Sequence, residues 1–170
     1  MRYLILFVAL GLVSGCAATY EQKVLMAPIA KLQKDKSILI ATPSNGSHGS
    51  KEYPDSGKST ALVFRSAFGR YSNNIAVSAE CMNFDCLKSK QFSSADYFVV
   101  PEILQWEDRN TEWSGIKDKL EIKVTVYDAR HGKELSTTII SGKSKWMTSG
   151  GDHPQDLLPE PIGQYVESLY

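Results

Sequence analysis

The residues most able to do chemistry stand in two short stretches, GKS at 57–59 and WEDRNTEW at 106–113. The first has the tail of the phosphate-binding pattern G-x-x-x-x-G-K-[ST], in which a glycine-rich backbone wraps the phosphates. The first glycine of that pattern would fall at Glu52, where a carboxylate would face the phosphates instead. The start of a helix with a hydroxyl cap explains the stretch better, so no nucleotide partner is expected.

The second stretch contains paired carboxylates and paired indoles. Glu107 and Glu112 could serve glycoside hydrolysis, which uses two carboxyl groups, but charged residues at the end of a hairpin are usually solvated. Trp106 and Trp113 bracket Arg109, and exposed aromatic residues with an arginine are typical of binding hot spots. The indoles could also stack on sugar rings, or both could belong to the core, so these interpretations stay open.

No catalytic or metal-binding pattern is recognisable in the sequence. It has no G-x-S-x-G elbow and no H-E-x-x-H pair. The histidines at 48, 131 and 153 are scattered, whereas zinc sites need clustered ligands. His153 lies near Asp152 and Asp156, which could suit a metal or an acid–base pair, although a solvated turn is the simpler explanation. We expect no enzyme activity, no cofactor and no metal.

Two of the three cysteines, Cys81 and Cys86, form a close pair in the sequence. The four residues between them differ from the C-x-x-C spacing of redox motifs. In an oxidising compartment a disulfide is the default for such a pair, and closing so short a loop stabilises by about 2 kcal/mol. The sequence therefore predicts a structural disulfide.

The remaining cysteine ends a hydrophobic leader. Arg2 precedes eleven apolar residues, 3–13, far fewer than the roughly 20 that span a bilayer as a helix. The residues VSGC at 13–16 resemble the lipobox of bacterial lipoproteins, in which the signal peptide is cleaved before a cysteine that carries acyl chains. The resemblance implies a signal peptide at 1–15 and a mature chain that begins with lipidated Cys16.

The residue after this cysteine, Ala17, bears on the destination of the protein. Among lipoproteins of Gram-negative bacteria, alanine rather than aspartate at this position implies export to the outer membrane. We expect a lipid-anchored protein that faces the periplasm, with display on the cell surface as the alternative. Two other interpretations of the leader compete: cleavage by an ordinary signal peptidase near Ala17 or Ala18, and retention of the stretch as an uncut anchor.

Composition limits the partners. The chain has 170 residues with 19 basic and 19 acidic side chains, and removal of residues 1–15 leaves 155 residues and takes away one basic residue, Arg2. That length suits a single domain with a substantial core. The near-neutral charge argues against nucleic acid or anionic lipid as the principal partner. The expected partners are the membrane, through the anchor, and an envelope protein or glycan.

Hydrophobic patterning predicts the elements that position these residues. Residues 16–35 are predicted to be a lipidated tether, and residues 36–170 a single α/β domain. Strands are predicted at 37–41, 74–79, 97–106, 120–127 and 135–146, and helices from about 59, over 87–92 and from 161. Two crossovers followed by two hairpins, in the order β-α-β-α-β-β-β-α, predict a two-layer α/β sandwich with a mixed sheet of about five strands.

Four segments of the chain resemble a known family. They are SGKSTALVFRSAF, QWEDRNTEWSG, VYDARHGKEL and PQDLLPEPIGQYVESLY. They are similar to a family of bacterial lipoproteins known only as a domain of unknown function, and the likeness covers residues 37–170. The order of elements resembles that of the amino-terminal domain of TolB. These resemblances imply a location and a fold but no activity.

The long loop and the tryptophan segment are predicted to meet. The loop at 42–57 follows the first strand and the tryptophan segment follows the third, and parallel strands end at the same edge of a sheet. One aromatic and cationic surface would then contain Lys51, Tyr53, Trp106, Arg109 and Trp113. The favoured function is a non-enzymatic lipoprotein of the outer membrane that acts as an interaction module. A glycan-binding module and a small hydrolase are the alternatives.

Overall fold

The computed structural model describes residues 18–89, 95–109, 116–145 and 153–170. A mixed sheet of six strands forms its centre, in the order β1-β8-β7-β6-β2-β5. The strands of this sheet are β1 (Thr19–Met26), β2 (Ile38–Ala41), β5 (Ile75–Ser78), β6 (Tyr97–Glu107), β7 (Lys119–Asp128) and β8 (Lys133–Lys143). The other elements are the hairpin strands β3 (Ser47–His48) and β4 (Lys51–Glu52), the helices α2 (Ser56–Phe68), α3 (Phe84–Ser89) and α5 (Pro159–Leu169), and the 3₁₀ turn η2 (Pro154–Leu157).

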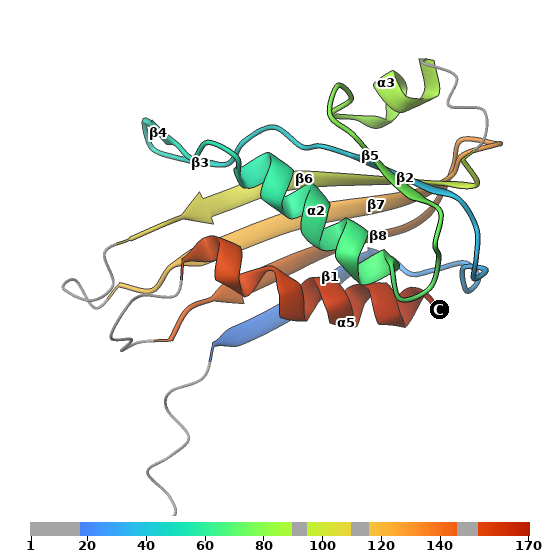
Figure 1. Ribbon diagram of the computed structural model, residues 1–170. Coiled ribbons are helices and arrows are strands. Elements are labelled where there is room, and N and C mark those ends of the chain that lie inside the picture. Colours follow the sequence, from blue (N-terminus) through green and yellow to red (C-terminus); the bar gives the residue numbers. More distant parts are fainter. Residues whose placement is uncertain (1–17, 90–94, 110–115, 146–152) are drawn as a thin grey trace, which may run out of the picture.

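The topology confirms the predicted two-layer α/β sandwich with a mixed sheet. Strand β2 pairs in parallel with both β5 and β6, as the two crossovers require. Strands β6, β7 and β8 then form an antiparallel meander. Helices α2 and α5 cover one face of the sheet, and α3 lies over the opposite face near β2 (Figure 1). None of the helices in the described ranges is long and apolar enough to cross a membrane.

The sheet has one strand more than expected because residues 19–26, expected as part of a tether, form β1. This strand pairs antiparallel with β8. Tyr20 packs against the core, and the side-chain amide of Gln22 donates a hydrogen bond to the carbonyl of Pro161 at 3.3 Å. The pairing satisfies backbone groups of β8 that would otherwise form an open sheet edge. The sequence signal of β1 is weak because its side chains are half-buried or exposed.

The main core lies between the sheet and helices α2 and α5. Its largest fully buried side chains include Phe64 and Phe68 of α2 and Tyr165 of α5. The last helix buries the predicted apolar face, which consists of Ile162, Tyr165, Val166 and Leu169. Helix α2 begins at Ser56 rather than near 59, and its N-cap residue Asp55 makes no side-chain cap bond, so the expected hydroxyl cap is absent.

A smaller core covers part of the opposite face of the sheet. Leu39 and Phe98 from the sheet pack there with Leu87 of α3. Cys81 and Cys86 form the disulfide that the sequence predicts, and it joins the segment after β5 to α3. Because α3 is short, this covalent link and a few apolar contacts hold it against the sheet.

Candidate functional site

The loop at 42–57 and the end of β6 meet at one end of the sheet, as predicted from the parallel pairing of β2 and β6. The Tyr53 hydroxyl donates to the carbonyl of Asp108 at 3.3 Å and accepts from the amide of Asp108 at 3.4 Å. Arg109 Nη2 lies 3.4 Å from His48 Nε2. These contacts fasten the β3–β4 hairpin to β6 (Figure 1). We call this set the hairpin platform: His48, Lys51, Tyr53, Asp108 and Arg109.

The outer part of the platform is cationic and aromatic. Lys51 is exposed, and its Nζ lies 4.6 Å from the centre of the Tyr53 ring. A cation over an aromatic ring is stabilised by about 0.5–1 kcal/mol at exposed sites. The hydrogen bonds between the Tyr53 hydroxyl and the backbone of Asp108 hold the same side chain in place. Lys51, Tyr53 and Arg109 therefore come together as the sequence analysis proposed.

A buried carboxylate holds Arg109 in place. Glu107 is only 4 % exposed, and its Oε2 accepts hydrogen bonds from Arg109 Nε at 2.9 Å and Nη2 at 2.8 Å. The Gln105 amide donates to the other carboxylate oxygen. Burial by itself raises the pKa of Glu107, but the hydrogen bonds from Arg109 and Gln105 outweigh it and lower that pKa below its ordinary value. Glu107 is therefore an ionised anchor for Arg109 at neutral pH.

A second buried carboxylate connects Arg109 to the neighbouring strands. Asp118, just before β7, is 1 % exposed and accepts the backbone N–H of Arg109 at 2.5 Å. Its own N–H donates to Ser144 Oγ at 2.9 Å, and its carbonyl accepts the N–H of Ser144 at 3.0 Å. The ends of β6, β7 and β8 are thus joined through polar groups beneath the platform.

The histidine noted in the sequence belongs to the same end of the molecule. His153 Nδ1 lies 3.0 Å from Asp108 Oδ1, and its backbone N–H donates to the Asp156 carboxylate at 3.0 Å. The hydrogen bond with Asp108 raises the pKa of His153, against the opposing effect of burial, and the charge of Asp156 adds to the rise. His153 and Asp156 form a capping box at the start of η2. Within the described ranges, no three His, Cys, Asp or Glu side chains are grouped so that they could hold a metal.

The position of Trp106 differs from the prediction that it belongs to an exposed binding surface. Its side chain is 2 % exposed and belongs to the main core, so it cannot contribute to a binding surface. The cause is a register irregularity in β6 between Ile103 and Gln105, after which the alternation of faces is reversed. A Cβ at Gly46 would lie 2.5 Å from the Trp106 Cβ, so the 42–57 loop packs directly on this residue. Trp106 holds the platform from below.

Several predicted residues lie outside the described ranges. These are Cys16, Trp113, Glu112 and Asp152. With Trp106 in the core and Trp113 outside these ranges, the structure describes no pair of indoles for sugar stacking.

The helix start at 57–59 is occupied by the chain itself. The Gly57 N–H donates to Asn45 Oδ1 at 3.2 Å. A Cβ at Gly57 would lie only 2.1 Å from the carbonyl oxygen of Pro43, which explains why the position needs glycine. Loop atoms therefore fill the space beside the first turn of α2, where a nucleotide phosphate would have to bind.

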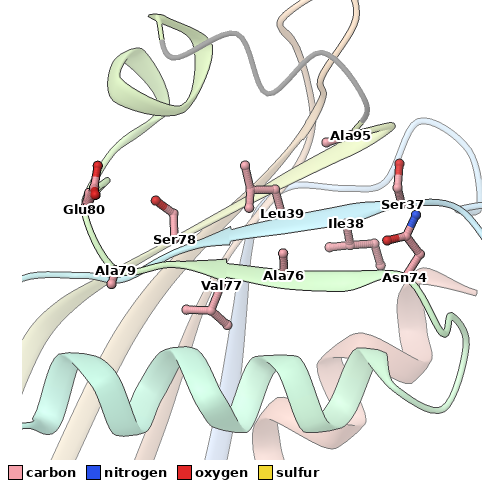
Figure 2. Close-up of a pocket in the computed structure, with 10 residues that line it drawn as sticks. All are labelled: Ser37, Ile38, Leu39, Asn74, Ala76, Val77, Ser78, Ala79, Glu80 and Ala95. Atoms are coloured by element: carbon pink, nitrogen blue, oxygen red, sulfur yellow. The ribbon is translucent and has the colours of Figure 1, made fainter.

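A separate hollow of about 340 Å³ lies at the edge strand β5, on the face opposite α2. Leu39, Ala76, Ser78 and Ala95 line it, with Glu80 at one side (Figure 2). The Ser78 hydroxyl already accepts the N–H of Cys81 at 3.2 Å. The described lining residues include no histidine, cysteine or basic side chain. Sequence reasoning missed this hollow because alanine and serine carry no chemical signature.

Fold and site together define a small two-layer α/β protein whose sheet end is closed by an internally paired polar network. The chain belongs to the family described as domain of unknown function DUF4823, whose sequence model matches residues 30–169. This match confirms the predicted membership of a family known only as a domain of unknown function. No curated protein matches the chain in sequence.

Solved structures share the fold at low sequence identity. The PelC dodecamer from Paraburkholderia phytofirmans superposes with a TM-score of 0.67 at 11% identity, covering 89% of this chain and 96% of that chain. A point variant of the same protein gives a TM-score of 0.66, again at 11% identity, with 89% and 97% covered. Lipoprotein GNA1162 from Neisseria meningitidis gives 0.47 at 18% identity, with 78% and 94% covered. The PelC likeness shows the fold alone, and the resemblance to TolB stays a prediction.

Proposed function

We propose that the protein is a lipoprotein of the outer membrane that faces the periplasm and acts as a non-enzymatic interaction module. The lipobox-like sequence that ends at Cys16 supports the anchor. The hairpin platform supports the binding role and is proposed as the surface that contacts an envelope protein.

The observation that carries this proposal is that contacts within the chain already hold the side chains of the platform in place. Tyr53 is tied to Asp108 and Arg109 to Glu107, so both side chains are already ordered without a partner. Ordering a flexible side chain on binding costs about 0.5–1.5 kcal/mol, and a surface fixed beforehand avoids that cost. Tyrosine and arginine are also the residue types that dominate binding energy at protein interfaces.

The charge of the platform favours an acidic protein surface as its partner. Lys51 is exposed, and the Arg109 side chain is one-third exposed. The Glu107 carboxylate that balances Arg109 is buried behind it, with its side chain 6 % exposed. Complementary charge at the rim of an interface increases the association rate and selects between partners.

The pairing of the carboxylates supports a non-enzymatic role over a hydrolase. Glu107 is bonded to Arg109, Asp118 to the N–H of Arg109, and Asp108 to His153. General acid–base catalysis requires a group that can reach a proton of the substrate, and these groups are engaged by the chain itself. The glycan alternative depended on paired indoles, of which Trp106 is in the core.

In-cell photocrosslinking tests the platform. A photoreactive residue at Glu52, which is exposed beside Lys51, should trap a partner that mass spectrometry identifies. We expect Lys51→Glu to abolish that crosslink, because it reverses the outward charge, and we expect Lys133→Glu to preserve it. Lys133 is the matched control because it is also exposed and begins β8 at the opposite end of the sheet. An unchanged crosslink in Lys51→Glu would overturn the proposal for the platform.

The anchor has its own test. We expect Cys16→Ser to abolish acylation and to leave an uncleaved or mislocalised precursor. Fractionation of the variant with the outer membrane at mature size would refute the lipoprotein assignment, whatever the crosslinking result.

A further inference from the structure

We propose that the outer edge of β1 pairs with the same edge of a second copy of this chain. The two β1 strands run antiparallel across a two-fold axis at Gln22 and join two six-stranded sheets into one. This self-association goes beyond the proposed contact with an envelope protein and does not depend on it.

Strand β1 leaves one edge of the sheet open. It is the outermost strand, with β8 on its inner side and, among the described residues, no strand on its outer side (Figure 1). Residues 19–24 pair regularly with β8 and include no proline, so each of them has a backbone N–H. In an antiparallel ladder, residues that bond to the neighbouring strand alternate with residues whose backbone groups point outward. Such an open edge is a template for a further strand.

The side chains of β1 alternate between the two faces of the sheet. Tyr20 packs against the main core, and the side-chain amide of Gln22 donates to the carbonyl of Pro161 in α5. The even-numbered residues of the regular stretch therefore face the helices, and the odd-numbered residues face the other way. Val24 lies on the helix side but is 55% exposed, so it is an apolar side chain that the fold leaves uncovered.

Two opposite charges stand on the other face of β1. Glu21 and Lys23 are both exposed, and neither forms an ion pair within the described part of the chain. Their partners across the ladder in β8 are Ser141 and Ile139, which carry no charge. Both charges therefore stand at the open edge, where a further strand would meet them.

Two-fold symmetry and these charges select one register. Residues directly opposite each other point to the same face, so a symmetric pair of strands has to be centred on one residue. A centre at Glu21 or at Lys23 places identical charges directly opposite each other, which destabilises a sheet. A centre at Gln22 places Glu21 of each copy opposite Lys23 of the other, so two complementary pairs form. The opposite edge strand, β5, has four residues and none of them is charged, so nothing in it selects a register.

The apolar residues fit the same register. The pairing of β1 with β8 becomes irregular after Val24, and a centre at Gln22 uses residues 20–24, all of which precede the irregularity. Val24 of each copy then lies opposite Tyr20 of the other. Pairs of an aromatic and a β-branched side chain are favourable across strands, so the second copy covers the exposed valine.

The interface leaves the hairpin platform accessible. Strands β8 and β7 separate β1 from β6, whose end carries the platform. One copy can therefore pair through β1 while its platform contacts another protein. The contact is small compared with standard interfaces of about 800 Å² per partner, so we expect a weak dimer.

Charge exchange between the two strands tests the register. Sedimentation equilibrium of the mature chain in a nonionic detergent, up to millimolar concentration, should show a dimer. Glu21→Lys or Lys23→Glu alone places like charges opposite each other twice, and each should raise the dissociation constant about tenfold or more. The double variant Glu21→Lys/Lys23→Glu restores both pairs and should dimerise as the wild type does. Lys133→Glu, at an exposed lysine of β8 away from the edge, is the control and should change nothing.

A mixture of the two single variants distinguishes self-pairing from a general effect of charge. Each variant repels itself, but the edge of Glu21→Lys carries two lysines and that of Lys23→Glu two glutamates. An equimolar mixture should therefore form a heterodimer at concentrations at which each variant alone is monomeric. Thermal unfolding checks that both variants fold, and we expect an unchanged Tm because both side chains are exposed.

A cysteine at the symmetry axis tests the geometry. Gln22→Cys places two thiols directly opposite each other, with Cα atoms about 4.5–5.5 Å apart, a distance that a disulfide can bridge. Val24→Cys lies on the same face, but its two copies are four residues apart along the strands, or about 14 Å. Mild oxidation of the purified chains with copper-phenanthroline should give a covalent dimer for Gln22→Cys. Val24→Cys should give none above the background of the wild-type chain, which carries the same other cysteines.

Three results would each show that the proposal is wrong. They are a wild-type chain that stays monomeric at millimolar concentration, a dimer that survives both single charge reversals, and a mixture of the single variants that does not associate. A covalent dimer of Val24→Cys as abundant as that of Gln22→Cys would contradict the register in the same way.

Discussion

Replacement of Arg109 by alanine provides the sharpest test of the network beneath the platform. The change removes both side-chain hydrogen bonds to Glu107 Oε2, at 2.8 and 2.9 Å. It keeps the backbone N–H that donates to Asp118. Glu107 stays behind as a buried carboxylate whose remaining neighbours are the Gln105 amide and the ring of His48, with Nδ1 3.7 Å from Oε1. The variant therefore removes the guanidinium from Glu107, together with its 3.4 Å contact to His48 Nε2.

The expected cost follows from the burial of the two groups. Removal of one member of a buried ion pair costs about 3–5 kcal/mol, and a hydrogen bond to a charged group contributes about 1.5–3 kcal/mol. The Arg109 side chain is 33% exposed and Gln105 still solvates the carboxylate, so the lower part of these ranges applies. We expect a loss of about 2 kcal/mol in unfolding free energy, or about 4–8 °C in Tm for a chain of this size.

The pH dependence of the loss identifies its cause. In the native protein the pKa of Glu107 is lowered, so its contribution to stability is present above the ordinary value of 4.5 and is lost as pH falls through the lowered pKa. Without Arg109 the largest of the influences that lower the pKa of Glu107 is lost, so this pKa should be higher in the variant than in the wild type, and the variant should lose less stability on acidification. The free-energy difference between wild type and Arg109→Ala should therefore shrink below about pH 4.5.

Urea unfolding at pH 7 and pH 4 measures both quantities. Lys123→Ala is the control, because Lys123 pairs with Glu102 at 3.4 Å on the exposed side of the sheet. Exposed pairs contribute less than about 1 kcal/mol. If Arg109→Ala costs no more than Lys123→Ala at pH 7, or if its cost is the same at both pH values, the reasoning on the buried pair is wrong.

Three further expectations follow from the structure. Reduction of the Cys81–Cys86 disulfide should lower the unfolding free energy by about 2 kcal/mol, and thiol titration of the unreduced, denatured mature domain should find neither of the two free. Trp106→Ala should cost about 3–5 kcal/mol in urea unfolding, and a cost below about 1 kcal/mol would place the indole outside the core. An NMR titration should give His153 a pKa above its ordinary 6.5 that falls in Asp108→Asn, and the stability from this pair should be present below pH 6.5 and lost as pH rises through the raised pKa.

Local pattern was enough to predict the middle and the end of the fold. Leu120, Ile122, Val124 and Val126 alternate with polar residues, and all four are buried on the helix face of β7. Such alternation is determined within one strand and needs no knowledge of its neighbours. The same holds for the apolar face of α5, because helical spacing is also a property of one segment.

Chain order alone also brought the two parts of the platform together. Because crossovers make β2 and β6 parallel, the loop after β2 and the segment after β6 leave the sheet at one end. The contacts of Tyr53 with Asp108 are the consequence. No pattern in the sequence marked Glu107 and Asp118 as the buried partners of Arg109, since those contacts depend on how three strand ends meet.

The sequence by itself determined the layers, the order of crossovers and hairpins, and the cysteine pair. The tertiary structure decided the rest, because an edge strand and a bulge depend on their partners. Residues 19–26 are a strand only because β8, more than a hundred residues later, has an edge for them to pair with. Trp106 faces the core only because the irregularity before Gln105 shifts the register of β6 against β7. Neither long-range pairing nor a register shift is encoded in the periodicity of a single segment.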